Sequence, residues 1–203
     1  MQRLSAQDIK TAAEISRVNP VALRAVIAVE SAGDGYLPNG WLKILFERHH
    51  FWKRLQSRGI WPGPIGAARP DLCGPTWDRK HYLGGVKEWD RISGVVSWAQ
   101  RNDPSHWESY KKAAYEACSF GLLQFMGGQY QEADYPDVYS LKHSFEESER
   151  NQLLAVCRWM EKNGTMDSLR REDWKAFARR YNGPGQVLIY SARLWVAFKR
   201  SGG

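Results

Sequence analysis

The feature that most constrains the fold is a helix-forming segment that is apolar on nearly every face. The stretch "NPVALRAVIAVESAGDG", residues 19–35, begins with Asn19 and Pro20, residue types favoured at the N-cap and at the first helical position. Arg24 is the only charged residue in the rest of the helix before its end. A helix that is apolar on all sides belongs in a protein interior, so we expect other elements to surround this one.

This helix ends in a carboxylate, Glu30, followed at once by small and turn-forming residues. A carboxylate at a helix C-terminus faces the negative end of the macrodipole, and apolar neighbours remove water from it. Both effects favour the neutral acid, so we expect the pKa of Glu30 to be raised. A carboxylic acid that stays protonated near neutral pH is the group a glycosidase needs to protonate a leaving oxygen. The alternative, a solvated helix end, stays open on this feature alone.

The rest of the pattern predicts a mainly α protein with one small hairpin. The segment "LKILF", residues 42–46, predicts a short strand, and the Pro- and Gly-rich segment 59–75 predicts a long loop. Capping boxes at Ser5 with Asp8 and at Ser144 with Glu147 predict two helix starts. We expect helices at about 6–17, 20–30, 47–58, 85–101, 105–117, 119–127, 144–163, 170–181 and 185–199. At 203 residues the chain is expected to form one domain, 1–203.

The charge balance indicates an acidic partner without identifying it. Lys and Arg outnumber Asp and Glu by 29 to 22, a formal charge of +7. Nucleic acid, an anionic membrane surface and an anionic cell-wall polymer are all compatible with this excess. The basic residues form only short pairs and no recognised nucleic-acid-binding motif is present, so we expect no nucleic-acid partner.

Cysteine usage and the N-terminus bear on the compartment. Cys73, Cys118 and Cys157 are odd in number and far apart, which argues against a disulfide framework and fits folding in a reducing cytoplasm. The N-terminal "MQRLSAQDIKTAAE" lacks the apolar region of a secretory signal. No apolar run is long enough to span a bilayer, so we expect no stable membrane insertion.

Two later stretches carry residues suited to binding a sugar. In "SFGLLQFMGG", residues 119–128, Gly121 permits a close approach and Gln124 can both donate to and accept from a sugar amide or hydroxyl. In "FARRYNGPG", residues 177–185, Tyr181 and Asn182 precede a glycine at a helix end. Taken alone, each stretch is explained by ordinary structure, as a buried helix start and as a helix stop.

Taken together, these pieces form a resemblance. Glu-Ser at a helix end, then Gly-Leu-Leu-Gln, then Tyr-Asn-Gly is the ordered triplet of goose-type lysozymes and lytic transglycosylases. More closely, "AVIAVESAGDGYLPNGWLKILFERHHF" resembles the opening of the bacteriophage N-acetylmuramidase endolysin family, and "FGLLQFMG" and "FARRYNGPG" resemble its middle and closing motifs. The resemblance runs from about Leu4 to Lys199, with a long and specific first motif and two short ones.

The resemblance implies a lysozyme-like fold with a small β-hairpin beside the catalytic helix. It also implies an endolysin that cleaves peptidoglycan between N-acetylmuramic acid and N-acetylglucosamine for host cell lysis. Glu30 falls on the family's catalytic acid, and we expect its partners in substrate binding to be Ser31, Ser119, Gly121, Gln124, Tyr181 and Asn182. Many relatives have Trp and Gly-x-Gln-Ile where this chain has "CSFGLLQF", a departure that bears on substrate contacts and not on the reaction.

The second carboxylate stays open. Inversion needs a base about 6.5–9.5 Å from the acid, and retention needs a closer nucleophile. Glu47 is the first candidate because it follows the predicted strand, although it can equally cap its helix or pair with Arg48. Asp34 is a second candidate or a turn former. A third possibility is that there is no base, as in lytic transglycosylases, where the muramic 6-hydroxyl attacks and leaves a 1,6-anhydro end.

We expect no metal and no cofactor. His49 and His50 lie beside Glu47, but there is no HExxH motif and the other histidines are scattered; phosphate-loop and dinucleotide fingerprints are absent.

The expected partner is the peptidoglycan glycan strand, bound by a monomer. Many relatives carry a further wall-binding module, and we expect this chain to be a catalytic domain alone. Without a signal, it should stay in the host cytoplasm until the membrane is breached and then reach the periplasm and wall. A non-catalytic wall-binding protein is the alternative outside the enzymes.

Overall fold

The computed structural model describes residues 1–31 and 33–203. The helices, in chain order, are α1 (Ala6–Ser16), α2 (Pro20–Glu30), α3 (Arg48–Gln56), α4 (Gly63–Ala68), α5 (Lys87–Asn102), α6 (Trp107–Glu116), α7 (Val138–Glu147), α8 (Glu149–Lys162), α9 (Thr165–Arg170), α10 (Trp174–Asn182) and α11 (Val187–Arg200). Shorter 3-10 helices are η1 (Arg79–His81), η2 (Gly127–Ala133) and η3 (Pro184–Gln186), and the strands are β1 (Ile44–Phe46), β2 (Cys118–Phe120) and β3 (Phe125–Met126). The predicted mainly α class is confirmed.

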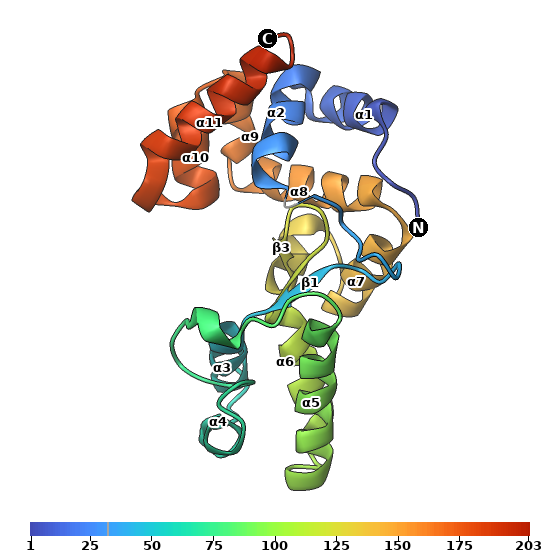
Figure 1. The fold of residues 1–203 in the computed structure, drawn as a ribbon, viewed down its shortest axis with the longest axis vertical. Helices are drawn as coiled ribbons and strands as arrows, with labels where there is room; N and C mark the ends of the chain where they lie inside the picture. Colours follow the sequence, from blue (N-terminus) through green and yellow to red (C-terminus); the bar gives the residue numbers. More distant parts are fainter. Residues whose placement is uncertain (32) are drawn as a thin grey trace.

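The helices form two groups with the small sheet between them (Figure 1). One group contains both ends of the chain: α1 packs against α2 and α8, α11 packs against α2 and α10, and α9 packs against α8 and α10. The other group contains α3 to α6. The chain leaves α2 at the end that faces the sheet, so Glu30 lies where the two groups meet (Figure 1).

The first two helices begin as the local sequence predicts. Ser5 accepts from the backbone N–H of Asp8, and the Asp8 carboxylate accepts in return from Ser5, which is a complete capping box. Asn19 accepts from the N–H of Val21 with Pro20 at the first helical position. The expectation that α2 is enclosed on all sides is only partly met, because Arg24 and Ala28 are exposed. Its buried residues are Ala22, Leu23, Ala25 and Val26.

The predicted helix at 119–127 is wrong, because this segment is a β-hairpin. Strand β2 pairs antiparallel with β1, placing Leu45 opposite Ser119, and also with β3, placing Phe120 opposite Phe125. The turn between them needs positive φ values at Gly121 (+70°) and Gln124 (+50°), which an α-helix does not permit. The result is a three-stranded antiparallel sheet in the order β1-β2-β3.

The predicted single helix from Ser144 to 163 is also wrong. The chain breaks at Ser148, whose extended backbone ends α7 and begins α8. The Ser148 side chain accepts from the N–H of Asn151, so Ser148 is the true N-cap, and Ser144 lies inside α7. The capping-box pattern at Ser144 and Glu147 therefore pointed to a start that lies four residues too early.

Other boundaries moved for local reasons. The predicted loop 59–75 contains the short helix α4, and the helix α9 was not predicted. The predicted helix at 170–181 begins instead at Trp174, after Asp173, whose side chain accepts from the N–H of Ala176 as an N-cap. The predicted strand near 44 and the helices at about 47–58, 85–101, 105–117 and 185–199 are confirmed within a few residues.

A buried ion pair fixes the end of β1. Glu88 is fully buried and Arg91 is nearly so, and Arg91 Nη1 lies 2.9 Å from Glu88 Oε2. The same carboxylate accepts from the backbone N–H of Phe46 at 3.1 Å, and Arg91 donates to the carbonyl of Phe46 at 2.8 Å. Its other oxygen accepts from Leu83 and Gly84 at 2.8 and 2.9 Å. Helix α5 thus holds both the strand that leads to Glu47 and the loop that follows Tyr82.

A buried amide fixes the hairpin turn against α8. Gln152 is 1% exposed, accepts from the N–H of Leu122 at 2.7 Å and donates to the carbonyl of Phe145 at 2.9 Å. A Cβ built on Gly121 would lie 2.4 Å from Gln152 Oε1, and one on Gly35 would lie 2.3 Å from it. Both glycines are therefore required by close packing against this side chain.

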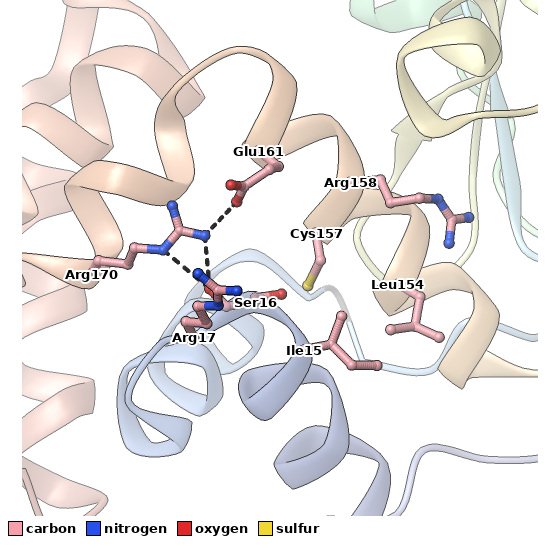
Figure 2. A pocket seen from close by; sticks show the side chains of 8 residues that line it. All are labelled: Ile15, Ser16, Arg17, Leu154, Cys157, Arg158, Glu161 and Arg170. Atoms are coloured by element: carbon pink, nitrogen blue, oxygen red, sulfur yellow. Dashed lines mark hydrogen bonds and ion pairs between the residues drawn. The ribbon is translucent and has the colours of Figure 1, made fainter.

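The junction of α1 with α8 and α9 contains a pocket of about 710 Å³ (Figure 2). Arg170 spans it, donating to the backbone carbonyl of Ser16 at 2.9 Å and to Glu161 at 2.6 Å. Cys157 lies in its wall and is nearly buried. Arg170 is thus paired with groups of α1 and α8 and connects these helices to α9. Neither Glu30 nor Glu47 lines this pocket. Among the described residues, no helix combines the length and the apolar character needed to cross a membrane.

Candidate active site

Glu30 occupies the last position of α2 and is partly buried. Burial raises the pKa of its carboxyl group, while a hydrogen bond from Asn182 and the positive charge of Arg193 lower it by less. The predicted rise is thus confirmed in direction, with burial as the main cause. Asn182 Nδ2 donates to Glu30 Oε1 at 3.0 Å. Ser31 caps the helix through its backbone N–H, which donates to the carbonyl of Ile27 at 2.9 Å.

Tyr181 belongs to the same cluster. Its ring stacks on Phe177 with centroids 5.3 Å apart and meets Trp159 edge-on at 5.5 Å. Burial and the negative charge of Glu30 both raise the pKa of the Tyr181 hydroxyl, so the phenol remains neutral over the physiological range. Helix α10 ends directly after Asn182, where Gly183 has a φ of +80°. That sharp turn aims the last two side chains of α10 toward the end of α2.

Glu47 lies at the N-cap of α3 but makes no capping hydrogen bond with its side chain. Its side chain is 16% exposed and accepts a hydrogen bond from the Tyr82 hydroxyl. Burial raises the pKa of Glu47, and the Tyr82 hydrogen bond partly offsets that rise. His49 Nδ1 lies 3.4 Å from Glu47 Oε2, but burial lowers the pKa of His49, so this contact favours a neutral imidazole. Glu47 is therefore held by Tyr82, not by Arg48.

Asp34 has a different environment from the two glutamates. Its side chain is 71% exposed and lies 3.2 Å from Arg3 Nη1 in a surface ion pair. The reading of Asp34 as a residue of the turn fits this position better than a catalytic one.

The hairpin residues Ser119, Gly121 and Gln124 are brought together by the turn itself. Ser119 Oγ donates to Gln124 Oε1 at 2.9 Å, and Gln124 Nε2 donates to the carbonyl of Gly121 at 2.8 Å. Gln124 adopts a left-handed backbone, a costly conformation for a residue other than glycine. Its amide is thus already engaged within the hairpin and is held in one orientation.

The eight expected residues form three groups. Glu30, Ser31, Tyr181 and Asn182 meet at the ends of α2 and α10; Ser119, Gly121 and Gln124 form the hairpin turn; and Glu47 lies at the far end of β1 with Tyr82. The turn lies near the exit of α2, since a Cβ on Gly35 would be 3.0 Å from the N–H of Leu122. Figure 1 shows β1 running away from that point toward α3. In the described part of the chain, no hydrogen bond joins Glu30 to Glu47: Glu30 is bonded to Asn182 and Glu47 to Tyr82.

Two residues of these clusters were not predicted. Arg193, on α11, is a cation whose positive charge lowers the pKa of Glu30, and it lies 163 residues further along the chain. Tyr82 is the partner of Glu47 and lies just after η1, in an irregular loop without a recognisable motif. Neither residue stands in a pattern of spacing that the sequence makes visible.

His49 and His50 stack on each other with ring centroids 4.4 Å apart. Burial lowers the pKa of His50 to about 4, with further contributions from His49 and from nearby Lys53 and Arg54. Among residues 1–31 and 33–203, no cluster of three or more His, Cys, Asp or Glu side chains could hold a metal ion. The pair is therefore best described as neutral, packed imidazoles beside Glu47.

The comparisons with known proteins agree with this arrangement. The model of the N-acetylmuramidase family matches residues 19–202. The crystal structure of the Burkholderia AP3 phage endolysin has 32% sequence identity and a TM-score of 0.84, over 98% of this chain and 72% of that chain. No curated protein matches at a significant level.

The family match covers Glu30, the hairpin and the α10–α11 segment together, and the solved endolysin reproduces the whole helical arrangement. Muramidases are glycoside hydrolases that act on peptidoglycan, so enzyme class and substrate class follow from the family. The mainly α fold with its small sheet is the fold of that endolysin. The chain therefore belongs to the N-acetylmuramidase family.

Proposed function

We propose that this enzyme cleaves the β-1,4 bond between N-acetylmuramic acid and N-acetylglucosamine in peptidoglycan, with Glu30 as the general acid, and that it does so in host cell lysis. The observation that carries the proposal is the state of Glu30, a partly buried carboxyl group with a raised pKa whose one oxygen is held by Asn182. A raised pKa keeps the proton available at neutral pH, which is the requirement of general acid catalysis.

The hydrogen-bond pattern assigns the proton to one oxygen. Asn182 donates to Oε1 of Glu30, so Oε1 is an acceptor and the acidic proton resides on Oε2. Oε2 then donates to the glycosidic oxygen as the bond to the anomeric carbon breaks. The neutral Tyr181 hydroxyl beside it can donate to the developing carboxylate or to a sugar oxygen. Positive charge on Arg193 stabilises the carboxylate after the proton has left.

We propose Glu47 as the base that activates water. Its carboxylate is partly buried and held in one orientation by Tyr82, whose hydrogen bond favours the ionised form that a base requires. Ser119, Gly121, Gln124 and Ser31 are proposed to contact the sugar. If the muramic 6-hydroxyl attacks in place of water, Glu47 has no catalytic role and the product carries a 1,6-anhydro end.

Two substitutions test the assignment, of which the first keeps the size of the side chain. Glu30→Gln should abolish release of soluble fragments from purified peptidoglycan while leaving co-sedimentation with the insoluble wall unchanged. Asn182→Ala should reduce the rate and move the alkaline limb of the pH–rate profile to higher pH, because the Asn182 hydrogen bond lowers the pKa of Glu30 and its loss raises that pKa. Retained lysis by Glu30→Gln would contradict the proposal, and loss of both lysis and a cooperative thermal transition would show misfolding instead.

Three further statements accompany this proposal. Residues 1–203 act as one catalytic domain, the enzyme works as a monomer, and it reaches the wall after the host membrane is breached. Light scattering of the purified protein tests the second statement. Fractionation of producing cells before and after membrane disruption tests the third.

A further inference from the structure

The C-terminal segment of the chain carries most of its net positive charge. Residues 170–203 hold eight Lys and Arg and two acidic residues, so they account for +6 of the formal +7. The acids there are already engaged, because Glu172 accepts from Asn19 at 3.1 Å and Asp173 caps α10. Arg170 and Arg171 belong to the end of α9, where Arg170 pairs with Glu161 and Asp167. The other six cations, Lys175, Arg179, Arg180, Arg193, Lys199 and Arg200, lie on α10 and α11. This asymmetry sets the α10–α11 surface apart from the nearly neutral remainder of the chain.

The same segment also exposes large apolar side chains. On α11, Leu188 is 72% exposed and Trp195 is 51% exposed, and Ile189 and Val196 are exposed as well. Ile189, Trp195 and Val196 follow Leu188 by one, seven and eight residues, a spacing that places all four side chains on one face of the helix. The opposite face of α11, with Leu194 and Phe198, is buried against the protein. Helix α11 is therefore packed on its inner side and apolar on its outer side.

Shallow grooves follow the two sides of this outer face. One, of about 600 Å³, lies between α11 and the end of α2 and is lined by Val29, Val196 and Arg200, among others. The other, of about 410 Å³, lies toward the start of α10 and is lined by Leu188, Trp195 and Lys175, among others. Lys199 extends over the Trp195 ring at 5.8 Å. Apolar chains thus form the ridge, and cations lie along both of its edges.

We propose that this outer face of α11 docks on an anionic phospholipid surface. A helix with exposed Trp and aliphatic side chains flanked by Lys and Arg lies in the plane of a membrane interface, with its apolar face among the acyl chains and its cations at the headgroups. Because the inner face of α11 is packed against the protein, only the outer face enters the interface and the helix does not cross the bilayer. The proposal concerns binding and does not depend on the proposed cleavage reaction.

Other occupants fit the face less well. A second copy of this chain would bring the same +6 segment against itself, which opposes association. A glycan strand is bound through hydrogen bonds and flat aromatic rings, whereas three of the four exposed apolar side chains here are aliphatic. An anionic bilayer satisfies both the charge and the apolar ridge.

The test measures co-sedimentation of the whole protein with vesicles of equal parts phosphatidylglycerol and phosphatidylcholine, against vesicles of phosphatidylcholine alone. We expect binding to the first and little to the second, weakened by salt. Lys199→Gln with Arg200→Gln should lower the partition coefficient about 25-fold. Leu188→Gln with Trp195→Gln should abolish detectable binding. Arg193 is left unchanged because it faces Glu30.

Matched control variants test whether the effects depend on the position of the substituted residues on α11 and not only on the loss of charge or apolar surface. Lys10→Gln with Lys87→Gln removes the same charge, and Ile15→Gln with Trp61→Gln removes equally exposed apolar chains elsewhere. Both controls should bind as the wild type does. All variants should release fragments from membrane-free peptidoglycan at the wild-type rate, so failure of docking and failure of cleavage are distinguishable.

Three results would overturn the proposal. The first is equal binding to neutral and anionic vesicles, and the second is equal loss of binding in the controls and in the α11 variants. The third is a dimer in light scattering that Leu188→Gln with Trp195→Gln converts to a monomer, because the face would then be covered by a second copy.

Discussion

Glu88→Gln is the substitution whose consequence the structure specifies in most detail. The two carboxylate oxygens accept from four donors, the N–H groups of Phe46, Leu83 and Gly84 and the guanidinium of Arg91. Glutamine has nearly the same shape but only one acceptor oxygen. Whichever way the amide is turned, two of the four donors face an NH₂ group, and Arg91 loses its counter-charge in a buried site.

The magnitude follows from these losses. An unsatisfied buried donor costs about 1–3 kcal/mol, and breaking a buried ion pair by removing one partner costs about 3–5 kcal/mol. The two estimates describe the same event and are not summed, so we expect the free energy of unfolding to fall by about 3–5 kcal/mol. For a chain of this size that corresponds to a drop in Tm of about 6–20 °C.

The assay is urea unfolding followed by tryptophan fluorescence at pH 7, with Arg91→Gln and the double variant completing a cycle. We expect a coupling free energy of about 1–3 kcal/mol between the two sites. Glu146→Gln is the matched control, because Glu146 pairs with Lys142 at 2.6 Å on the surface of α7, where such a pair contributes less than about 1 kcal/mol. A loss below about 1 kcal/mol for Glu88→Gln would refute the reasoning that this network is fully satisfied.

Three other predictions concern pH and the hairpin. The pKa of Glu30 is raised on folding, so ionised Glu30 destabilises the folded state above its folded pKa, and this loss of stability disappears below its unfolded pKa. Glu30→Gln should therefore raise Tm at pH 7.5 and leave Tm unchanged near pH 3. A lower Tm of the variant at pH 7.5 would contradict this prediction. The pKa of His50 is lowered to about 4, so the wild type should lose stability as the pH falls from 6.5 to 4, and His50→Gln should lose less stability over the same range. An NMR titration that places the pKa of the His50 imidazole near 6.5 would contradict this prediction. Gln152→Leu leaves the buried Leu122 N–H without its acceptor, whereas the Phe145 carbonyl keeps its hydrogen bond from the Tyr36 hydroxyl. The substitution should cost about 1–3 kcal/mol in urea unfolding, and an unchanged midpoint would show that the turn does not depend on this amide.

The elements that the sequence predicts well are those with local signals. Helices α1 and α2 start where Ser5 and Asn19 satisfy the first N–H groups, and all the residues involved lie within three positions of each other. The rise in the Glu30 pKa was predictable for the same reason, since an apolar helix must be packed and its last residue shares that burial.

The hairpin was not predictable from the same kind of signal. The segment after Ser119 is apolar enough for a helix, and its strands exist because β2 pairs with β1, about 75 residues earlier in the chain, and because Gln152 holds the turn. Strand pairing is decided by such distant contacts, which no local pattern displays. The capping pattern at Ser144 failed similarly, since Ser148 is an equally good N-cap and packing chose between them.

The candidate site shows the same difference between residues with local sequence signals and residues placed by long-range contacts. The glutamates and the α10 terminus were predicted from the ordered motifs, but their partners were not. Arg193 lies near Glu30 because α11 packs on α2. Tyr82 contacts Glu47 because Glu88 of α5 accepts from Leu83, directly after Tyr82. Contacts between elements far apart in the chain set the environment of both carboxylates.

The most direct test of the central claim is mass spectrometry of the fragments released from purified peptidoglycan by the wild type, Glu30→Gln and Glu47→Gln, each first shown to unfold cooperatively. We expect reducing muramic acid ends from the wild type and no release by either variant. Release by Glu30→Gln at the wild-type rate would contradict the assignment of the acid. Anhydro-muramic ends from both the wild type and Glu47→Gln would leave Glu30 as the acid and remove Glu47 from the reaction.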